Sequence, residues 1–168
     1  NAVVQPMGLY SNKIHSLDDI KADTKIAIPN DPSNGGRALV LLEKAGLIKL
    51  KPDYKGEASI HDVAENPRGV KLGELEAAQL PISLQDLDVA CVPMNYAVSG
   101  GLDVNKQGFY FESRDAKYAL IIIAARPDNV QSPEVQTFVK CYQSPEVAAF
   151  IKEKFKGQIN PAWEQPAK

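Results

Sequence analysis

The sequence lacks several features that would assign the protein to a common functional class. Its 168 residues contain no apolar run near the roughly 20 residues that a membrane-spanning helix requires. The net charge is only −2, and lysines and acids are interspersed, so no nucleic-acid or membrane-surface partner is expected. An apolar fraction of 44% and a charged fraction of 24% are typical of a globular protein. The chain is long enough for one ordinary domain or two small lobes.

Cysteine and histidine are also scarce. The two cysteines, Cys91 and Cys141, are too few for a disulfide framework, and their apolar surroundings predict small buried side chains. The two histidines, His15 and His61, stand in polar segments without the spacing of a zinc site. No metal or cofactor is expected from these residues.

Enzyme motifs find little support in the remaining residues. Ser99 in VSGG lacks the Gly-x-Ser-x-Gly pattern of a nucleophile elbow. Glu74 and Glu76 occupy alternate positions that favour solvated charges over a catalytic carboxylate pair. The first residues, NAVVQPMGLYS, also lack the charged and apolar regions of a signal peptide.

What the sequence does contain is an alternation of apolar strands and amphipathic helices. A helix through Leu41 and Leu42 should end at Gly46, and Pro81 should break a later segment into two short helices. The predicted strands are Val3–Tyr10 (interrupted at Pro6), Lys25–Pro29, Val70–Leu72, Val89–Val92, Phe109–Phe111 and Ala119–Ala125. This alternation predicts an α/β fold with helices on the faces of a sheet.

Two helices near the carboxyl terminus share one capping signature. Ser132 and Ser144 each begin the sequence Ser-Pro-Glu-Val. Serine is favoured as N-cap, proline at the first helical position, and an acid at the positive helix end. Both helices are therefore predicted to begin at these motifs, and Gly157 to end the second.

The segment NDPSNGGRAL lies between a predicted strand and a predicted helix. It lacks the Gly-Lys-Ser/Thr end of a P-loop and the glycine spacing of a dinucleotide-binding motif. Asn34 is expected to cap the helix, while Gly35 and Gly36 permit a tight turn. Arg37 is unfavourable in a first helical turn without an anion. Two interpretations remain open for it: a solvated arginine, or a binding group for a ligand carboxylate.

A second candidate binding residue, Asn95, follows the strand Val89–Val92. In α/β sheets, ligands bind outside the carboxyl ends of the strands, where this residue and the Arg37 loop are both expected. A side-chain amide can accept from an ammonium and donate to a carboxylate, and an amino acid carries both groups. The neighbouring Tyr96 could line such a pocket. The alternative is that Asn95 only caps the next helix.

Several segments resemble the NlpA/MetQ-type lipoproteins, the substrate-binding components of methionine ABC importers. They occur in the family's order, cover most of the chain, and read QPMGLYS, IAIPNDPSNGGRALVLLEKAGLIKLK, ENPRGVKLGELEAAQLPISLQDLDVA, NYA and YQSPEVAAFIKEKFKG. The resemblance implies a type II periplasmic-binding-protein-like fold whose two lobes close on a free amino acid. It also implies a protein that catalyses no reaction.

The family's binding residues carry over onto matching positions. The arginine of NGGRAL pairs with the ligand carboxylate in the family, which implies this role for Arg37, and the asparagine of NYA carries over onto Asn95. Asn34 and Gly35 belong to the same loop as Arg37 and are implied as further ligand-binding residues. Methionine or a related amino acid is the implied ligand, with another apolar amino acid, a dipeptide or a role as an amino-acid sensor as alternatives.

The resemblance also implies partners, location and domain organisation. The partners are a membrane permease and its ATPase, and the location is the cell envelope, as a periplasmic or membrane-anchored lipoprotein. Residues 1–22 would form a hinge strand and connection, residues 23–105 the second lobe, and residues 106–168 the returning hinge strand and C-terminal helices.

Two departures from the family pattern carry expectations of their own. The chain begins where family members are already well into the fold, so most of the first lobe is expected to be missing. Exposed strand edges and apolar patches should then favour self-association. In addition, Leu120 stands where family members often have asparagine.

Replacing Arg37 by alanine should weaken ligand binding and barely change stability, because an arginine opposes the helix dipole there.

Overall fold

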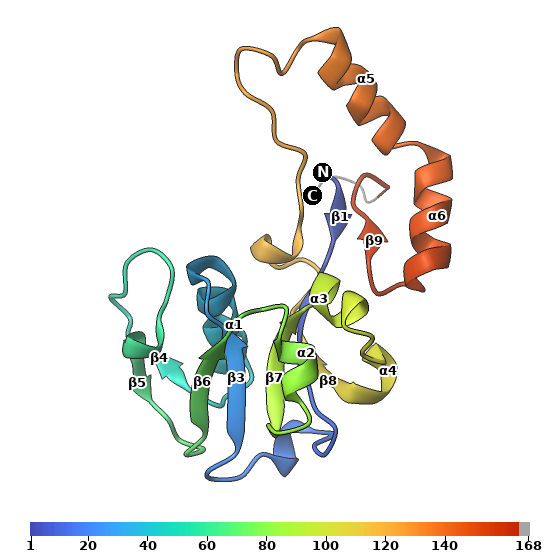
Figure 1. Ribbon diagram of the computed structural model, residues 1–168. Coiled ribbons are helices and arrows are strands. Elements are labelled where there is room, and N and C mark those ends of the chain that lie inside the picture. Colours follow the sequence, from blue (N-terminus) through green and yellow to red (C-terminus); the bar gives the residue numbers. More distant parts are fainter. Residues whose placement is uncertain (165–168) are drawn as a thin grey trace. The chain divides into compact units, whose positions relative to one another are not determined.

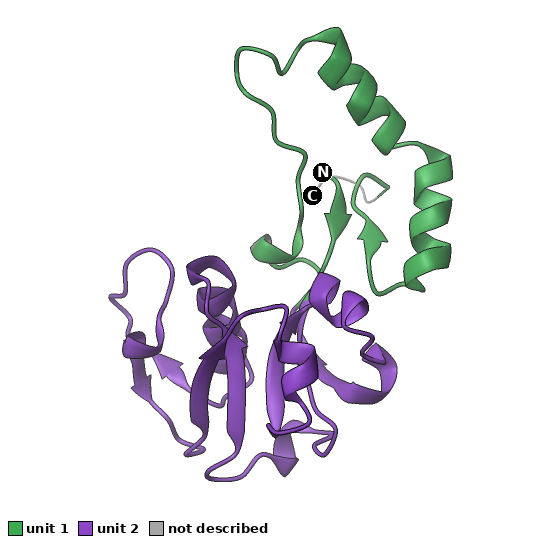
Figure 2. Ribbon diagram, in the orientation of Figure 1, with its two compact units in different colours: residues 1–6, 113–168 green, residues 7–112 purple. Residues whose placement is uncertain are grey.

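The computed structural model describes residues 1–164, apart from the side chain of Lys117. The chain forms two compact units (Figure 2). Unit 1 comprises residues 1–6 and 113–168, and unit 2 comprises Met7–Glu112. Unit 2 therefore contains all four predicted ligand-binding residues.

Unit 2 is built on a five-stranded sheet with the order β6-β3-β7-β2-β8 (Figure 1). The strands are β2 (Met7–Tyr10), β3 (Lys25–Pro29), β6 (Lys71–Leu75), β7 (Val89–Pro93) and β8 (Gly108–Phe111). Strand β3 is parallel to β6 and β7, whereas β2 is antiparallel to β7 and β8. The carboxyl ends of β3, β6, β7 and β8 therefore lie at one edge of the sheet, together with the first residue of β2.

Helices connect the strands, as predicted for an α/β fold. They are α1 (Pro32–Lys44), α2 (Leu80–Ser83), α3 (Met94–Ser99) and α4 (Val104–Gln107), with the 3-10 turns η1 (Leu17–Asp19) and η2 (Ile60–Asp62). A separate antiparallel pair is formed by β4 (Lys49–Leu50) and β5 (Val63–Glu65).

The prediction that Pro81 breaks a helix is wrong. Pro81 lies in the first turn of α2, where the missing N–H of proline costs no helical hydrogen bond.

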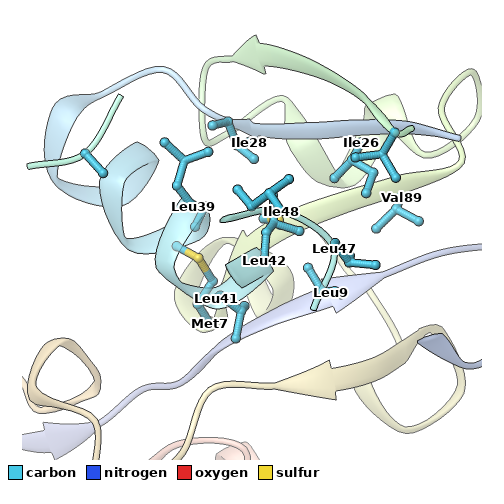
Figure 3. Packing of buried hydrophobic residues seen from close by; sticks show 14 of the residues in the cluster. Met7, Leu9, Ile26, Ile28, Leu39, Leu41, Leu42, Leu47, Ile48 and Val89 are labelled. Carbon is cyan, nitrogen blue, oxygen red and sulfur yellow. The ribbon is translucent and has the colours of Figure 1, made fainter. Parts of the chain in front are cut away.

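The core of unit 2 lies between α1 and one face of the sheet. Leu39 and Leu42 of α1 are fully buried against Ile26 and Ile28 of β3 and against Val89 of β7 (Figure 3). The two isoleucines share a face because alternate residues of a strand point the same way. Helix α1 ends at Lys44, and Gly46 follows with a φ of 72°, so its predicted role in helix termination is confirmed.

Gly35 and Gly36 permit close packing instead of the predicted tight turn. Both lie inside α1 and neither has a positive φ. A Cβ on Gly35 would lie 2.7 Å from the carbonyl oxygen of Pro29, and one on Gly36 would lie 3.0 Å from the backbone of Ala58. The prediction of a turn is therefore wrong: Gly35 lets the helix approach the end of β3, and Gly36 lets it approach the backbone of Ala58.

Unit 1 consists of two helices and a short ladder of extended chain. Its elements are β1 (Val3–Val4), η3 (Lys117–Ala119), α5 (Pro133–Tyr142), α6 (Pro145–Phe155) and β9 (Asn160–Pro161). One edge of β1 pairs with β9 in antiparallel fashion. At the other edge, Ala2 N donates to Ile121 O and Ile121 N donates to Val3 O, both at 2.8 Å.

The predicted strand Ala119–Ala125 forms only in part. Its described ladder contacts are the bridge of Leu120 to Val4 and the hydrogen bonds of Ala119 and Ile121 to the first residues of the chain. The described segment 121–125 contains no regular strand. A strand requires a neighbour along its length, and the sequence pattern indicated the apolar character of this segment without showing whether a neighbour exists.

The capping prediction for the last two helices is confirmed. The hydroxyl of Ser132 accepts from Val135 N at 3.4 Å, and that of Ser144 accepts from Val147 N at 3.3 Å. Backbone N–H donation at the helix start also lowers the pKa of Glu134 and of Glu146. Within residues 1–164, the helices are all too short or too polar to cross a bilayer.

The two cysteines have different environments, which corrects one prediction. Cys91 in β7 is fully buried, as predicted, and burial raises the pKa of its thiol. Cys141 in α5 is exposed, so the prediction that it is buried is wrong. Helix α5 contains no buried residue in this structure, although its sequence is amphipathic.

Candidate functional site

The candidate site lies at the edge of the sheet where β3, β7 and β8 end. Asp31 and α1 follow β3, Met94 and α3 follow β7, and Glu112 follows β8. Met7, the first residue of the antiparallel β2, pairs with Pro93 at the same edge. In open α/β sheets this edge is where ligands bind, so the topology brings the predicted segments together.

Asp31, and not Asn34, caps helix α1. The Asp31 carboxylate accepts from Asn34 N at 2.9 Å and from the Asn34 side-chain amide at 3.1 Å. Pro32 follows the cap because proline is favoured at the first helical position. The predicted cap was therefore placed three residues too late, and Asn34 instead holds the capping carboxylate. An internal acid already compensates the positive helix end.

Arg37 lies in the second turn of α1 and is buried, with its side chain 8% exposed. Its Nε lies 3.0 Å and 3.2 Å from the two carboxylate oxygens of Glu112, and its Nη2 also donates to Oε2. This side-on pairing uses the planar fork of the guanidinium. The solvated-arginine interpretation is therefore wrong, and so is the placement of Arg37 in the first turn.

Glu112 is held by the sheet as well as by Arg37. Its backbone N donates to Met7 O at 2.9 Å, and its Oε2 accepts from Met7 N at 3.1 Å. Sequence reasoning missed Glu112, which is 75 positions from Arg37. The sequence did contain one indication of its role: Glu112 directly follows a predicted strand, and the carboxyl ends of the strands are where Arg37 was expected.

The pairing changes the expected consequence of removing Arg37. Truncation of one partner leaves the other charge buried and uncompensated, which costs about 3–5 kcal/mol. We therefore expect Arg37→Ala to lower stability, in place of the barely changed stability predicted from the sequence. That prediction assumed an arginine that faces only solvent and the helix dipole, whereas Arg37 is the buried partner of Glu112.

Asn95 lies at the same edge in the first turn of α3, with an exposed side chain. Pro93 is the N-cap of this short helix, so the alternative in which Asn95 is only a cap is wrong. Tyr96 follows and is half-buried. The contacts of the described residues join Arg37 to Glu112 and leave Asn95 as a separate polar group at the edge.

The residues considered for catalysis or metal binding do not form a site. Glu74 and Glu76 are exposed, and the Ser99 hydroxyl donates to the carbonyl of Tyr96 within its own helix. Residues 1–164 contain no group of three histidine, cysteine, aspartate or glutamate side chains that could hold a metal ion.

Comparisons with known proteins found a matching family model, similar sequences and similar solved structures. A model of the NlpA lipoprotein family matches residues 1–163. The D-methionine-binding lipoprotein MetQ of Escherichia coli K12 is 42% identical over 165 residues, which are 97% of this chain and 60% of that protein. Outer membrane lipoprotein 3 of Mannheimia haemolytica is also 42% identical, over 97% of this chain and 62% of its own length.

A solved structure shows the same fold. A nutrient-binding protein from Burkholderia cenocepacia, bound to methionine, matches with a TM-score of 0.89 and 44% identity. The match covers 96% of this chain and 68% of that one. The α/β fold prediction is confirmed, and the chain spans about 60% of the length of the sequence relatives.

Proposed function

Because this chain belongs to the NlpA lipoprotein family, we propose that it is the substrate-binding protein of an ABC importer for methionine or a related amino acid. The observation that carries the proposal is the buried Arg37, fixed at the ligand-binding edge of an α/β sheet. The methionine-binding relative from Escherichia coli and the methionine-bound structure from Burkholderia cenocepacia support the choice of ligand. Binding without chemical conversion is the whole activity proposed.

In this proposal, each site residue has one role. Arg37 binds the ligand carboxylate with its guanidinium, and the exposed Asn95 accepts a hydrogen bond from the ligand ammonium. Asn34 and Gly35 shape the approach to Arg37, because the glycine lets α1 lie close to the end of β3. The predicted division into residues 1–22, 23–105 and 106–168 belongs to the same proposal, with the site residues in the second lobe.

The proposed partners and location follow from the family. A membrane permease and its ATPase would receive the ligand, and a lipoprotein of the cell envelope would deliver it. The E. coli and Mannheimia relatives, both described as lipoproteins, support this placement.

A titration followed by NMR tests the ligand. Adding L-methionine or D-methionine to the isotope-labelled chain should shift three signals saturably: the Gly35 amide, the Arg37 Nε–H and the Asn95 side-chain amide. This experiment detects affinities down to the millimolar range. A dissociation constant of about 10 mM corresponds to a binding free energy of about −3 kcal/mol. If these signals are unchanged at about 10 mM of each enantiomer, the proposed function is wrong.

A matched pair of variants tests the role of Asn95. Asn95→Ala should weaken methionine binding by about 1–3 kcal/mol, because one hydrogen-bonding partner is lost. Asn105→Ala is the control, since Asn105 is also exposed at the start of a short helix of unit 2. Equal affinities for the two variants would remove Asn95 from the site.

Another apolar amino acid, such as leucine, or a dipeptide is the alternative ligand. Competition against bound methionine ranks these ligands directly.

We also propose that the chain self-associates through the apolar surface of unit 1. Ile122 is 63% exposed, and it directly follows Ile121, whose backbone is hydrogen-bonded to Ala2 and Val3. Contiguous apolar surface and unpaired strand edges favour association. Ile122→Lys should lower the mass measured by light scattering at high concentration, whereas Ile82→Lys, at a 68% exposed site of unit 2, should not. A monomer at every concentration would contradict the proposal.

A further inference from the structure

Asn34 is the one asparagine of the sequence that is followed by glycine. In a flexible chain, the backbone N of the following residue can attack the side-chain Cγ of an asparagine. The attack closes a succinimide ring and releases ammonia, and water then opens the ring to aspartate or isoaspartate. Glycine favours ring closure, because it has no side chain to hinder the attack and its backbone is the most flexible. Asn34 is therefore the position where an unfolded chain should deamidate fastest.

The native fold holds both reacting groups of this pair apart. The attacking atom, Gly35 N, already donates to Asp31 O at 2.7 Å. The side-chain amide of Asn34 is held as well, because it donates to both carboxylate oxygens of Asp31 at 3.1 Å. Both residues also lie in α1, and ring closure requires Asn34 to leave the helical backbone conformation. Reaction therefore requires the start of α1 to open.

This protection comes from the helix start and not from burial of the side chain. Asn34 is only half-buried, so water and base can reach it in the folded chain. The reactive pair is also built into the fold, because a Cβ at Gly35 would lie 2.7 Å from the carbonyl oxygen of Pro29. The fold thus requires the glycine that makes Asn34 reactive, and the cap at Asp31 restrains the reaction.

Refolding does not reverse the modification, because the ammonia has left. The product carries a carboxylate where the Asn34 amide donates in the native chain, directly beside the carboxylate of Asp31. Isoaspartate also adds one methylene to the backbone within the first turn of α1. Either product therefore changes the charge and the hydrogen bonding of the helix start permanently.

We propose that Asn34 is the principal deamidation site of this chain and that the capped start of α1 restrains the reaction. In the reaction, Gly35 N loses its proton and bonds to Cγ of Asn34, and Nδ2 leaves as ammonia. One water molecule then opens the ring, so amide and water become carboxylate and ammonia without any oxidant or reductant. Each lasting opening of the helix start is thereby recorded as a negative charge beside Asp31. The inference does not depend on the ligand that the chain binds.

Peptide mass mapping of the whole chain, incubated in mildly alkaline buffer, tests the assignment. In urea that unfolds the chain, Asn34 should gain the mass of one deamidation faster than every other asparagine. Without urea, Asn34 should react at least about tenfold more slowly, because the reaction waits for local opening. A faster asparagine elsewhere in urea, or equal rates at Asn34 with and without urea, would overturn the inference.

Two cap variants test whether Asp31 is the restraint. Asp31→Ala removes the acceptor of the Asn34 backbone and side-chain N–H groups, so Asn34 should deamidate about fivefold faster. Asp103→Ala is the matched control, because Asp103 caps α4 by accepting from Asn105 N, and it should leave the rate at Asn34 unchanged.

The outcomes of this comparison are decisive in either direction. Faster deamidation in Asp31→Ala alone supports the inference. Equal rates at Asn34 in the two variants would show that the cap of α1 does not restrain the reaction, and the inference would be wrong. Circular dichroism shows whether each variant folds. If Asp31→Ala does not fold, the rates of the native chain with and without urea still decide.

Discussion

Unit 2 buries most of its large apolar side chains, whereas unit 1 exposes many of its own. In unit 2, α1 and the five-stranded sheet enclose a continuous core that includes Leu39, Leu42 and Ile28, all fully buried. In unit 1 the buried cluster around Val4 is small, and the exposed large apolar residues include Leu120, Ile121, Ile122, Val130, Phe138 and Phe150.

The difference arises from the number of neighbours and not from residue type. Helices α1 and α5 are both amphipathic, but α1 packs on a sheet and α5 contains no buried residue. Amphipathic helices obtain most of their stability from such packing. Unit 2 should therefore be the more stable region, and unit 1 should open first.

Thiol labelling should show the largest contrast between the units. Cys141 should react with a thiol reagent in the native state, because it is exposed on α5. Cys91 is fully buried, and burial raises the pKa of its thiol, so labelling must wait for unfolding. For a stability of about 5 kcal/mol, Cys91 should react on the order of 10³-fold more slowly. Comparable rates would mean that Cys91 is accessible without global unfolding of unit 2.

Truncating one leucine of unit 2 and one phenylalanine of unit 1 should lower the unfolding free energy by very different amounts. Leu42→Ala should cost about 2–5 kcal/mol of unfolding free energy, because it opens a cavity in the core of unit 2. Phe138 is 56% exposed, so Phe138→Ala should change stability by less than about 0.5 kcal/mol. Urea unfolding followed by circular dichroism measures both values. A large loss in Phe138→Ala would indicate that α5 is covered in solution.

Acid titration should destabilise unit 2 through Asp88. The backbone N–H of Lys25 donates to its carboxylate at 2.9 Å and, with the Lys13 ammonium, lowers the pKa of Asp88. Since the folded pKa lies below the unfolded value of about 3.9, the stabilisation is complete above that value and is lost as the pH falls through the folded pKa. Asp88→Asn should cost about 1 kcal/mol at pH 7, a modest value for a partly exposed group, and less in acid.

Asp86 provides the control for this titration, because it is an exposed carboxylate two residues away. Asp86→Asn should leave the unfolding free energy at pH 7 unchanged. If the difference between Asp88→Asn and the native chain persists unchanged at pH 2, the effect does not arise from the charge of Asp88.

The smallest expected effects are those of the helix caps in unit 1. Ser144→Ala removes the acceptor of Val147 N and should cost about 1 kcal/mol or less. Ser144→Asp keeps a capping acceptor and should cost less than the alanine variant. Hydrogen exchange of the α6 amides reports the loss locally, and the amides of β3 should not change. Faster exchange in both places would show that the units unfold together.

Much of the fold was predictable because it rests on local chemistry. The alternation of apolar strands and helices predicted the α/β class, and the Ser-Pro-Glu-Val motifs predicted the starts of α5 and α6. Arg37 and Asn95 were expected near the carboxyl ends of strands, and they follow β3 and β7 of one sheet. Their roles toward a ligand stay a prediction. The cap of α1 was misplaced, since Asp31 and Asn34 are both favoured caps and only the backbone geometry distinguishes them.

The sequence by itself determined where α5 and α6 begin, where α1 ends and which residues are apolar, because capping and periodicity act between residues close in the chain. Only the tertiary structure decided the partner of Arg37, the need for glycine at position 36, and the exposure of Cys141. Each depends on contact between segments far apart in the chain, or on the lack of it. Glu112 reaches Arg37 only because β8 lies beside β2 and ends at the same edge of the sheet as β3.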